Sequence, residues 1–205
     1  MRVTPVTPDL LADEVTGVVA ARPGRVRLAV DGPPPTRPRV LADAVAARLR
    51  VLGRATVVID TADWLRPASL RLEFGHTDPD MFLDGWLDTG GLRREVLEPA
   101  APDGSGRVLP RLWDAAADRS HRDRHVDLPA DGVVVLAGAL LLGRGLPLDL
   151  AVHLRMGEQA LTRRLPADER WTLPAYARYA TEHTPEEIAD LLVLADHPDR
   201  PAIRR

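Results

Sequence analysis

The sequence contains no cysteine, no lysine and no asparagine among its 205 residues. Without cysteine, the chain cannot form a disulfide, a thiolate metal site or a cysteine nucleophile. Without lysine, it has no Schiff base, no ammonium general base and no point charge of the kind that often binds phosphate; all 27 basic residues are arginine. Any chemistry must therefore rest on arginine, histidine, carboxylates, hydroxyls and the backbone.

Long hydrophobic runs and a strong net charge are also missing. The longest apolar run, 133–142, is interrupted by Gly138 and is too short to span a bilayer. Residues 1–8 lack the apolar core of a signal peptide. The net charge of −3 gives no general attraction to nucleic acid or anionic membranes. We therefore expect a soluble, cytoplasmic protein with neither nucleic acid nor membrane as a partner, and homo-oligomerisation is left open.

Apolar segments of strand length alternate with segments of helical periodicity. The strand-like segments are nearly continuously apolar, which is typical of parallel strands covered on both faces: Arg25–Asp31, Ala55–Asp60, Gly132–Leu136, Leu148–Leu154 and Asp190–Leu194. The helical segments begin near Leu10, Leu41, Leu92, Glu158 and Pro174. This alternation predicts an α/β fold of three layers around a parallel sheet of about five strands. We expect an N-terminal helical segment, 1–24, and one domain, 25–205. Residues 99–107 and 114–130 read as long loops.

The first strand of the domain leads into a proline-rich loop. Phosphate-binding loops read GxxxxGK[ST], and they hold phosphate with backbone N–H groups, a lysine and a hydroxyl. Counted from Gly32, the last three positions of that motif are occupied by Arg37, Pro38 and Arg39. Four prolines in the window lack an N–H group: Pro33, Pro34, Pro35 and Pro38. The loop is predicted to bind ATP–Mg²⁺ weakly at most, although arginines at a helix N-terminus could still hold an anion through Gly32, Arg37 and Arg39.

The order of the segments that follow resembles the uridine kinase and phosphoribulokinase-like P-loop kinases. The segments that carry this resemblance are 61–67 (TADWLRP), 77–82 (TDPDMF), 109–114 (LPRLWD), 133–138 (VVVLAG), 161–164 (LTRR) and 189–198 (ADLLVLADHP). No single segment is specific, and the ordered set over residues 25–200 is what identifies the family. The resemblance implies a P-loop kinase fold with ATP and Mg²⁺ as the expected cofactors.

The resemblance also assigns roles to individual residues. It implies that substrate is bound by Asp78, Trp113, Asp114 and Arg119. It implies that Arg163 and Arg164 belong to a lid that closes over phosphates. The acidic position that activates the acceptor hydroxyl falls on Ala62, so a carboxylate shifted by one place, Asp63, is the candidate catalytic base. Ala137 stands where the family has a glutamate beside Mg²⁺. No metal site is predicted elsewhere, since His121 and His125 have no further ligand at suitable spacing.

Three functions remain open from the sequence. The first is a uridine-kinase-like protein with a degenerate phosphate-binding loop, a pseudokinase that binds a nucleoside-like or small polar ligand, with its kinase activity lost or repurposed. The second is an active nucleoside or small-molecule kinase, a transferase in which arginines replace the loop lysine. The third is a non-catalytic interaction module. Phosphoryl transfer depends mainly on positioning and on neutralising phosphate charge, so the loss of lysine, hydroxyl and acid together favours the first.

Overall fold

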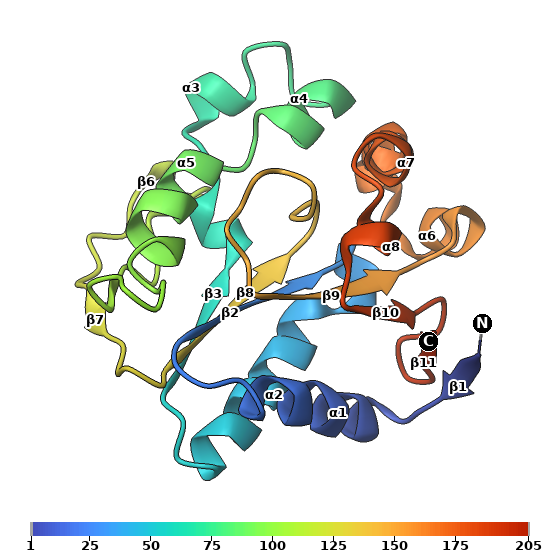
Figure 1. Ribbon diagram of the computed structural model, residues 1–205. Coiled ribbons are helices and arrows are strands. Elements are labelled where there is room, and N and C mark those ends of the chain that lie inside the picture. Colours follow the sequence, from blue (N-terminus) through green and yellow to red (C-terminus); the bar gives the residue numbers. More distant parts are fainter. Residues whose placement is uncertain (1, 205) are drawn as a thin grey trace.

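A computed structural model describes residues 2–204. At its centre lies a seven-stranded sheet in the order β1-β11-β10-β9-β2-β8-β3 (Figure 1). Its strands are β1 Val3–Pro5, β2 Val26–Asp31, β3 Thr56–Asp60, β8 Val133–Gly138, β9 Leu150–Arg155, β10 Leu191–Leu194 and β11 Ala202–Arg204. The five strands from β10 to β3 are parallel, while β11 and β1 add antiparallel pairs at one edge. The predicted parallel sheet is confirmed, and the two short strands extend it.

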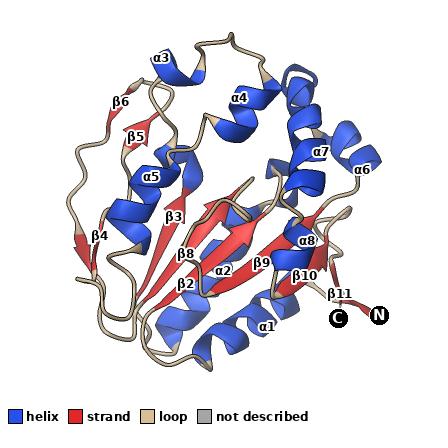
Figure 2. Ribbon diagram, turned by 45° about the horizontal axis from the view of Figure 1, so that its top comes forward, coloured by secondary structure: helices blue, strands red, loops and turns tan. Residues whose placement is uncertain are grey.

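Helices cover both faces of this sheet, as Figures 1 and 2 show. Two long helices, α1 and α2, pack together on one face, and the shorter helices lie mostly over the other. The helices are α1 Pro8–Ala20, α2 Pro38–Val51, α3 Ala68–Arg71, α4 Pro79–Asp84, α5 Thr89–Leu92, α6 Glu158–Arg164, α7 Leu173–Glu182 and α8 Pro185–Ile188. None of the helices within residues 2–204 is long and apolar enough to cross a bilayer.

Each face of the sheet has its own hydrophobic core. Val30 of β2 belongs to the core under α1 and α2, whereas its neighbour Ala29 belongs to the core under α5 and α7. Val135 and Val134 of β8 divide between the two cores in the same way. Side chains alternate between the faces of a strand, so a sheet covered on both faces needs apolar residues at nearly every position. This packing explains the continuous apolar runs in the sequence.

The structure corrects two sequence-based expectations for the middle of the chain. The helix expected from Leu92 begins earlier, at Thr89, because the Asp88 carboxylate accepts the N–H of Gly91 at 2.7 Å and caps it. It then continues as a short π-helix, Arg93–Leu97. The expected long loop 114–130 contains paired strands instead. The strands β6 Arg119–Ser120 and β7 Val126–Asp127 lie within it, and they pair with two strands that begin before it, β5 Trp113–Asp114 and β4 Arg107–Val108, as β5–β6 and β4–β7.

The strand order brings several carboxyl ends to one edge of the sheet. The chain runs from β2 through α2 to β3 on one side of β2, whereas β9 lies on the other side. The order therefore reverses beside β2, and open α/β sheets bind ligands in the crevice at such a point. A ligand site is accordingly expected at the residues that end β2, β3, β8 and β9.

Candidate functional site at the carboxyl ends of the strands

The loop between β2 and α2 is folded onto itself. The N–H of Gly32 donates to the carbonyl of Gly138, at 2.9 Å. The N–H groups of Thr36 and Arg37 donate to the carbonyls of Pro33 and Pro34, both at 2.9 Å, within a short 3-10 turn. Of the four loop residues that retain an N–H, only Arg39 has it outside these bonds. The backbone donors of the loop are therefore largely occupied by the protein's own carbonyls.

The two loop arginines are paired with carboxylates. Arg37 donates to Asp199 at 2.8 Å, between largely exposed side chains. Arg39 donates to Asp43 one helical turn further on, at 2.9 Å, and to Asp60 at the end of β3, at 3.2 Å. Exposed pairs of this kind are weak, so a stronger anionic ligand could replace the carboxylates. Arg37 itself has left-handed backbone angles, φ 59° and ψ 53°, which glycine adopts without strain.

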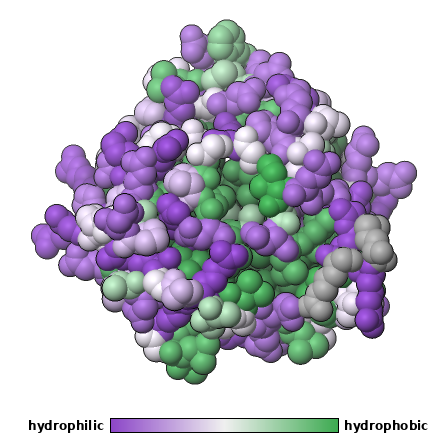
Figure 3. Space-filling view, in the orientation of Figure 1, coloured by the Kyte–Doolittle hydropathy of each residue, from purple (hydrophilic) through white to green (hydrophobic). Residues whose placement is uncertain are grey.

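A cavity of about 500 Å³ opens beside this loop; we call it the strand-end cavity. It lies between the loop, the ends of β3 and β8, and helices α4 and α7. Among its lining residues are Gly32, Arg39, Asp60, Phe82, Trp86, Leu140, Arg144 and Tyr176. Figure 3 shows apolar side chains gathered in the middle of the molecular face and surrounded by hydrophilic ones. The volume is in the range that encloses a small organic ligand.

Aromatic side chains form one wall of the strand-end cavity. Phe82 meets Trp86, Trp171 and Tyr176 edge to face, with ring centroids 5.2, 5.5 and 5.8 Å apart. The Arg71 guanidinium lies 5.2 Å from the Trp86 ring centre and fixes that ring from behind. Four of the chain's eight phenylalanine, tryptophan and tyrosine residues thus form one cluster, and all of them except Trp171 line the cavity. A rigid aromatic wall suits a planar ring in the ligand.

Arg144 supplies a positive charge to the same cavity. Its guanidinium donates to the backbone carbonyls of Asp84, at 3.2 Å, and Leu140, at 3.5 Å. It makes none of the ion pairs found among residues 2–204. Burial removes water from the charged form and lowers the pKa of Arg144, and the nearby Asp84 charge offsets this only in part. A ligand with a carbonyl or an anionic group would compensate that loss.

The candidate catalytic residue Asp63 turns away from this cavity. Its carboxylate lies 3.0 Å from Nε2 of His121, in the β5–β6 hairpin. Its neighbours Asp60 and Ala62 line the cavity instead. Asp78 caps the start of α4 by accepting the N–H of Met81 at 2.8 Å. The structure therefore engages Asp63 in a contact with His121, which is distant in sequence, and Asp78 in the cap of its own helix.

The other predicted substrate residues come together in the β5–β6 hairpin. Asp114 and Arg119 are cross-strand partners, and Trp113 donates its indole N–H to Asp118 at 3.1 Å. The N–H groups of Ala117 and Ala116 hold the pKa of Asp114 below its usual value. None of these three lines the strand-end cavity. The structure gives each of the three a partner within the hairpin or its turn, and their role in binding substrate stays a prediction.

The predicted lid arginines lie at the end of α6. Arg164 donates to the carbonyl of Asp196 at 2.9 Å and lies 3.3 Å from Nδ1 of His197, which ties α6 to the segment after β10. Arg163 is exposed. Neither lines the strand-end cavity in this structure.

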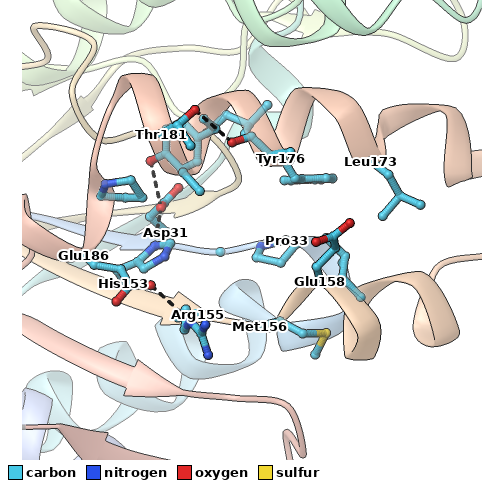
Figure 4. A pocket seen from close by; sticks show the side chains of 18 residues that line it. Asp31, Pro33, His153, Arg155, Met156, Glu158, Leu173, Tyr176, Thr181 and Glu186 are labelled. Atoms are coloured by element: carbon cyan, nitrogen blue, oxygen red, sulfur yellow. Dashed lines mark hydrogen bonds and ion pairs between the residues drawn. The ribbon is translucent and has the colours of Figure 1, made fainter.

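A second cavity, of about 330 Å³, lies on the other side of Gly32; we call it the histidine cavity. It lies between the ends of β2 and β9 and the helices α6, α7 and α8, and it shares Gly32, Leu140 and Tyr176 with the strand-end cavity. Figure 4 shows His153 and Arg155 of β9 opposite Tyr176 and Thr181 of α7. Sequence reasoning missed this site, although a histidine inside the apolar run Leu148–Leu154 was a usable signal.

Solved structures with the same fold were found by comparison. A possible uridine kinase from Bacillus stearothermophilus matches with a TM-score of 0.71 and 19% identity, over 88% of this chain and 96% of that one. A protein described as a fructose transport system kinase from Silicibacter sp. TM1040 matches with 0.63 and 22%, over 91% and 98%. D-glycerate 3-kinase from Cryptococcus neoformans matches with 0.54 and 13%, over 87% and 83%.

At these identities the likeness concerns the fold. No protein-family model matches the chain, and no curated protein matches its sequence. The chain therefore has the fold of P-loop kinases, and the predicted resemblance is confirmed at that level. Substrate and activity have to be argued from the chain's own residues.

Proposed function

We propose that this protein binds a small ligand with a planar ring, nucleoside-like in character, in the strand-end cavity, and that it has lost ordinary ATP-dependent kinase activity. The observation that carries the proposal is the internal bonding of the loop. A phosphate-binding loop works because several N–H groups point at the phosphates. Here those of Gly32, Thr36 and Arg37 are bonded to protein carbonyls, and four prolines have none.

The cavity beside the loop supports the ligand part of the proposal. Phe82 and Trp86 offer a surface for a ring, Arg144 offers donors for a carbonyl or anionic group, and Asp60 offers a carboxylate for hydroxyl groups. Asp60 already accepts the N–H of Ala62 at 2.9 Å and a hydrogen bond from Arg39, which holds it in place. This set of groups matches a base and a sugar better than it matches a triphosphate.

Active phosphoryl transfer through arginines is the alternative function. Arg37 and Arg39 stand at the loop, but both are paired with carboxylates, and Asp63 bonds to His121. For transfer, the arginines would have to exchange these carboxylates for phosphate oxygens, and a base would have to reach the acceptor hydroxyl. The ligand-binding proposal requires no such rearrangement.

Isothermal titration with ATP–Mg²⁺ and with a panel of nucleosides tests the proposal. We expect at least one nucleoside to bind, and ATP–Mg²⁺ to bind more weakly than about 1 mM. Nucleoside phosphorylation at an ordinary kinase rate would overturn the proposal, and so would micromolar ATP binding that Arg37→Ala abolishes. Binding of neither class would favour an interaction module.

Two tryptophans provide a matched pair of variants. Trp86→Ala removes a ring from the strand-end cavity, whereas Trp113→Ala removes one from the hairpin that the sequence predicts as the substrate site. We expect Trp86→Ala to weaken nucleoside binding by about tenfold or more, the effect of one stacked ring. Trp113→Ala should leave binding unchanged. The reverse result would assign substrate binding to Trp113, Asp114 and Arg119, and thermal melting of both variants checks that they fold.

A further inference from the structure

A carboxylate, an imidazole and a phenol form a buried network at the wall of the histidine cavity. Asp31, at the end of β2, is fully buried. Its Oδ1 accepts the N–H of Leu141 at 2.9 Å, and its Oδ2 accepts the Tyr179 hydroxyl at 2.9 Å. Oδ2 also lies 2.7 Å from Nδ1 of His153 on β9. The Tyr179 oxygen in turn accepts the N–H of Leu142, at 2.8 Å.

This network fixes which nitrogen of His153 carries the proton. A carboxylate can only accept, so Nδ1 of His153 is the donor to Asp31, and in the neutral ring Nε2 carries the lone pair. Burial and the Asp31 charge raise the pKa of Tyr179, which keeps its hydroxyl a donor. Among residues 2–204, the side chain of His153 makes no hydrogen bond other than the one to Asp31.

Nε2 of His153 is open to the histidine cavity. His153 is only 6% exposed and lines that cavity. No fully buried side-chain nitrogen or oxygen of the described residues lacks a partner, so the unbonded Nε2 must be reached from the cavity. A buried group held in one tautomer, with a free acceptor facing an empty space, is the arrangement of a binding or catalytic histidine.

The charges around the cavity select the kind of ligand. Its lining carboxylates are Asp31, Glu158 and Glu186, and its lining guanidinium is Arg155. Glu186 is balanced by two guanidinium groups, Arg155 at 3.1 Å and Arg204 at 2.6 Å, which leaves the carboxylates of Asp31 and Glu158 without an arginine partner among the described residues. Most of the remaining lining is apolar and includes Met156 and Leu173, which Figure 4 shows on the same side of the cavity as Glu158. The surplus of negative charge favours a cation, and the apolar wall favours a hydrocarbon body.

We propose that the histidine cavity is a second binding site, specific for a small organic amine whose protonated nitrogen donates a hydrogen bond to Nε2 of His153. Asp31 acts behind the ring as a positioning residue that fixes the tautomer and adds its negative charge. The apolar part of the amine lies against the α6 and α7 side of the cavity, and Glu158 stands at its mouth. This inference does not rest on the nucleoside site, because it uses different polar groups.

Three small molecules that share a phenyl ring test whether the cavity selects a cation: benzylamine, benzyl alcohol and benzoate. Each is titrated into the full chain, and binding is followed by protein NMR. We expect benzylamine to bind with a dissociation constant of about 1 mM or tighter, benzyl alcohol about tenfold more weakly, and benzoate not at all. Long-range ¹H–¹⁵N spectra should show His153 protonated at Nδ1, and its Nε2 signal should move on adding benzylamine. Equal binding of benzoate, an unmoved Nε2 signal or no binding of benzylamine would overturn the proposal.

Variants separate a ligand role from a structural one. His153→Gln should weaken benzylamine binding by about tenfold or more, whereas His76→Gln, at an exposed histidine outside the cavity, should not. If His153→Gln fails to fold, substitutions at two exposed positions, Glu158 and Ala177, test the proposal instead. Glu158→Gln should weaken the amine by about two- to threefold without affecting benzyl alcohol. Ala177→Phe, which fills the cavity from α7, should abolish binding, with Ala20→Phe on α1 as its control. Unchanged amine binding in Ala177→Phe would place the amine elsewhere.

Discussion

The two cavities on either side of Gly32 differ in how their polar groups are held. In the strand-end cavity, Arg39 is about half exposed, with 47% of its side chain accessible, and it shares two partly exposed carboxylates. In the histidine cavity, Asp31 has no exposed surface and is bonded by three donors. Polar groups of the first kind can exchange partners at small cost, whereas those of the second kind cannot. The first cavity is therefore suited to rearrange around a ligand, and the second to present one fixed acceptor.

Among the substitutions proposed for the two cavities, replacement of Asp31 should cause the largest loss in the free energy of unfolding. Asp31→Ala leaves the N–H of Leu141, the Tyr179 hydroxyl and Nδ1 of His153 without their acceptor in a buried place. Each unsatisfied buried donor costs about 1–3 kcal/mol, so we expect a loss of about 3 kcal/mol or more in the free energy of unfolding. Urea denaturation followed by circular dichroism measures it.

The matched change in the other cavity is Asp60→Ala. Asp60 also ends a strand and also holds a backbone N–H, that of Ala62, and an arginine. Because its carboxylate is partly exposed, we expect a loss of about 1 kcal/mol. If Asp31→Ala and Asp60→Ala lose the same free energy of unfolding, the polar groups of the two cavities are not held differently, and the contrast is wrong.

Removal of the Tyr179 hydroxyl sharpens the same contrast at a lower magnitude. Tyr179→Phe keeps the packing of the ring but leaves the buried N–H of Leu142 without its acceptor and takes one donor from Asp31. We expect a loss of about 2 kcal/mol in unfolding free energy. Tyr176→Phe is the control, because the Tyr176 hydroxyl has no hydrogen-bond partner among residues 2–204. If Tyr176→Phe loses more stability than Tyr179→Phe, the hydrogen bonds of the Tyr179 hydroxyl do not stabilise the fold as proposed.

Most of the fold could be predicted from the sequence, for a physical reason. Strands such as Val26–Asp31 and Val133–Gly138 are covered on both faces, and the resulting apolar runs are visible without any tertiary information. The edge strand Val3–Pro5 and its partner Ala202–Arg204 are three residues each, too short for a pattern to stand out. Only their pairing across the length of the chain defines them.

The candidate site was harder to predict, because cavities are made by residues far apart in sequence. Trp113 is followed by an acidic residue and resembles a family segment, whereas Trp86 carries no such signal. Trp86 reaches the strand-end cavity because α4 leans over the strand ends. His153 and Asp31 are 122 residues apart and meet only because β2 and β9 are neighbours. The predicted roles of Asp63, Asp78 and Arg119 stay predictions until binding is measured.

Repair of the loop tests whether its internal bonds are what excludes nucleotide. The triple change Arg37→Gly, Pro38→Lys and Arg39→Thr restores a flexible residue, a lysine and a hydroxyl at the start of a helix that is already in place. We expect ATP–Mg²⁺ affinity to rise by about tenfold or more, measured by calorimetry. Transfer to uridine should stay slow, because Ala62 and Ala137 supply no carboxylate.

Adding Ala62→Asp and Ala137→Glu to the repaired loop separates the loss of nucleotide binding from the loss of the carboxylates that phosphoryl transfer needs. A correctly placed general base is worth about 10²–10⁴ in rate, so any transfer activity should appear at this stage. If the triple variant alone phosphorylates uridine at an ordinary rate, the missing acids do not matter. If it gains no nucleotide affinity, the remaining prolines rather than the three changed residues keep the loop closed.

A small effect is expected at the backbone of Arg37. Its left-handed angles cost a residue with a Cβ atom about 1 kcal/mol relative to glycine, while its exposed pair with Asp199 contributes little. Arg37→Ala keeps the strain and removes the pair, whereas Arg37→Gly removes both. We expect the glycine variant to be about 1 kcal/mol more stable than the alanine variant in urea denaturation. Equal stability would mean that the loop relaxes at this position, and that the fixed turn from Pro33 to Arg37 is less rigid than its hydrogen bonds indicate.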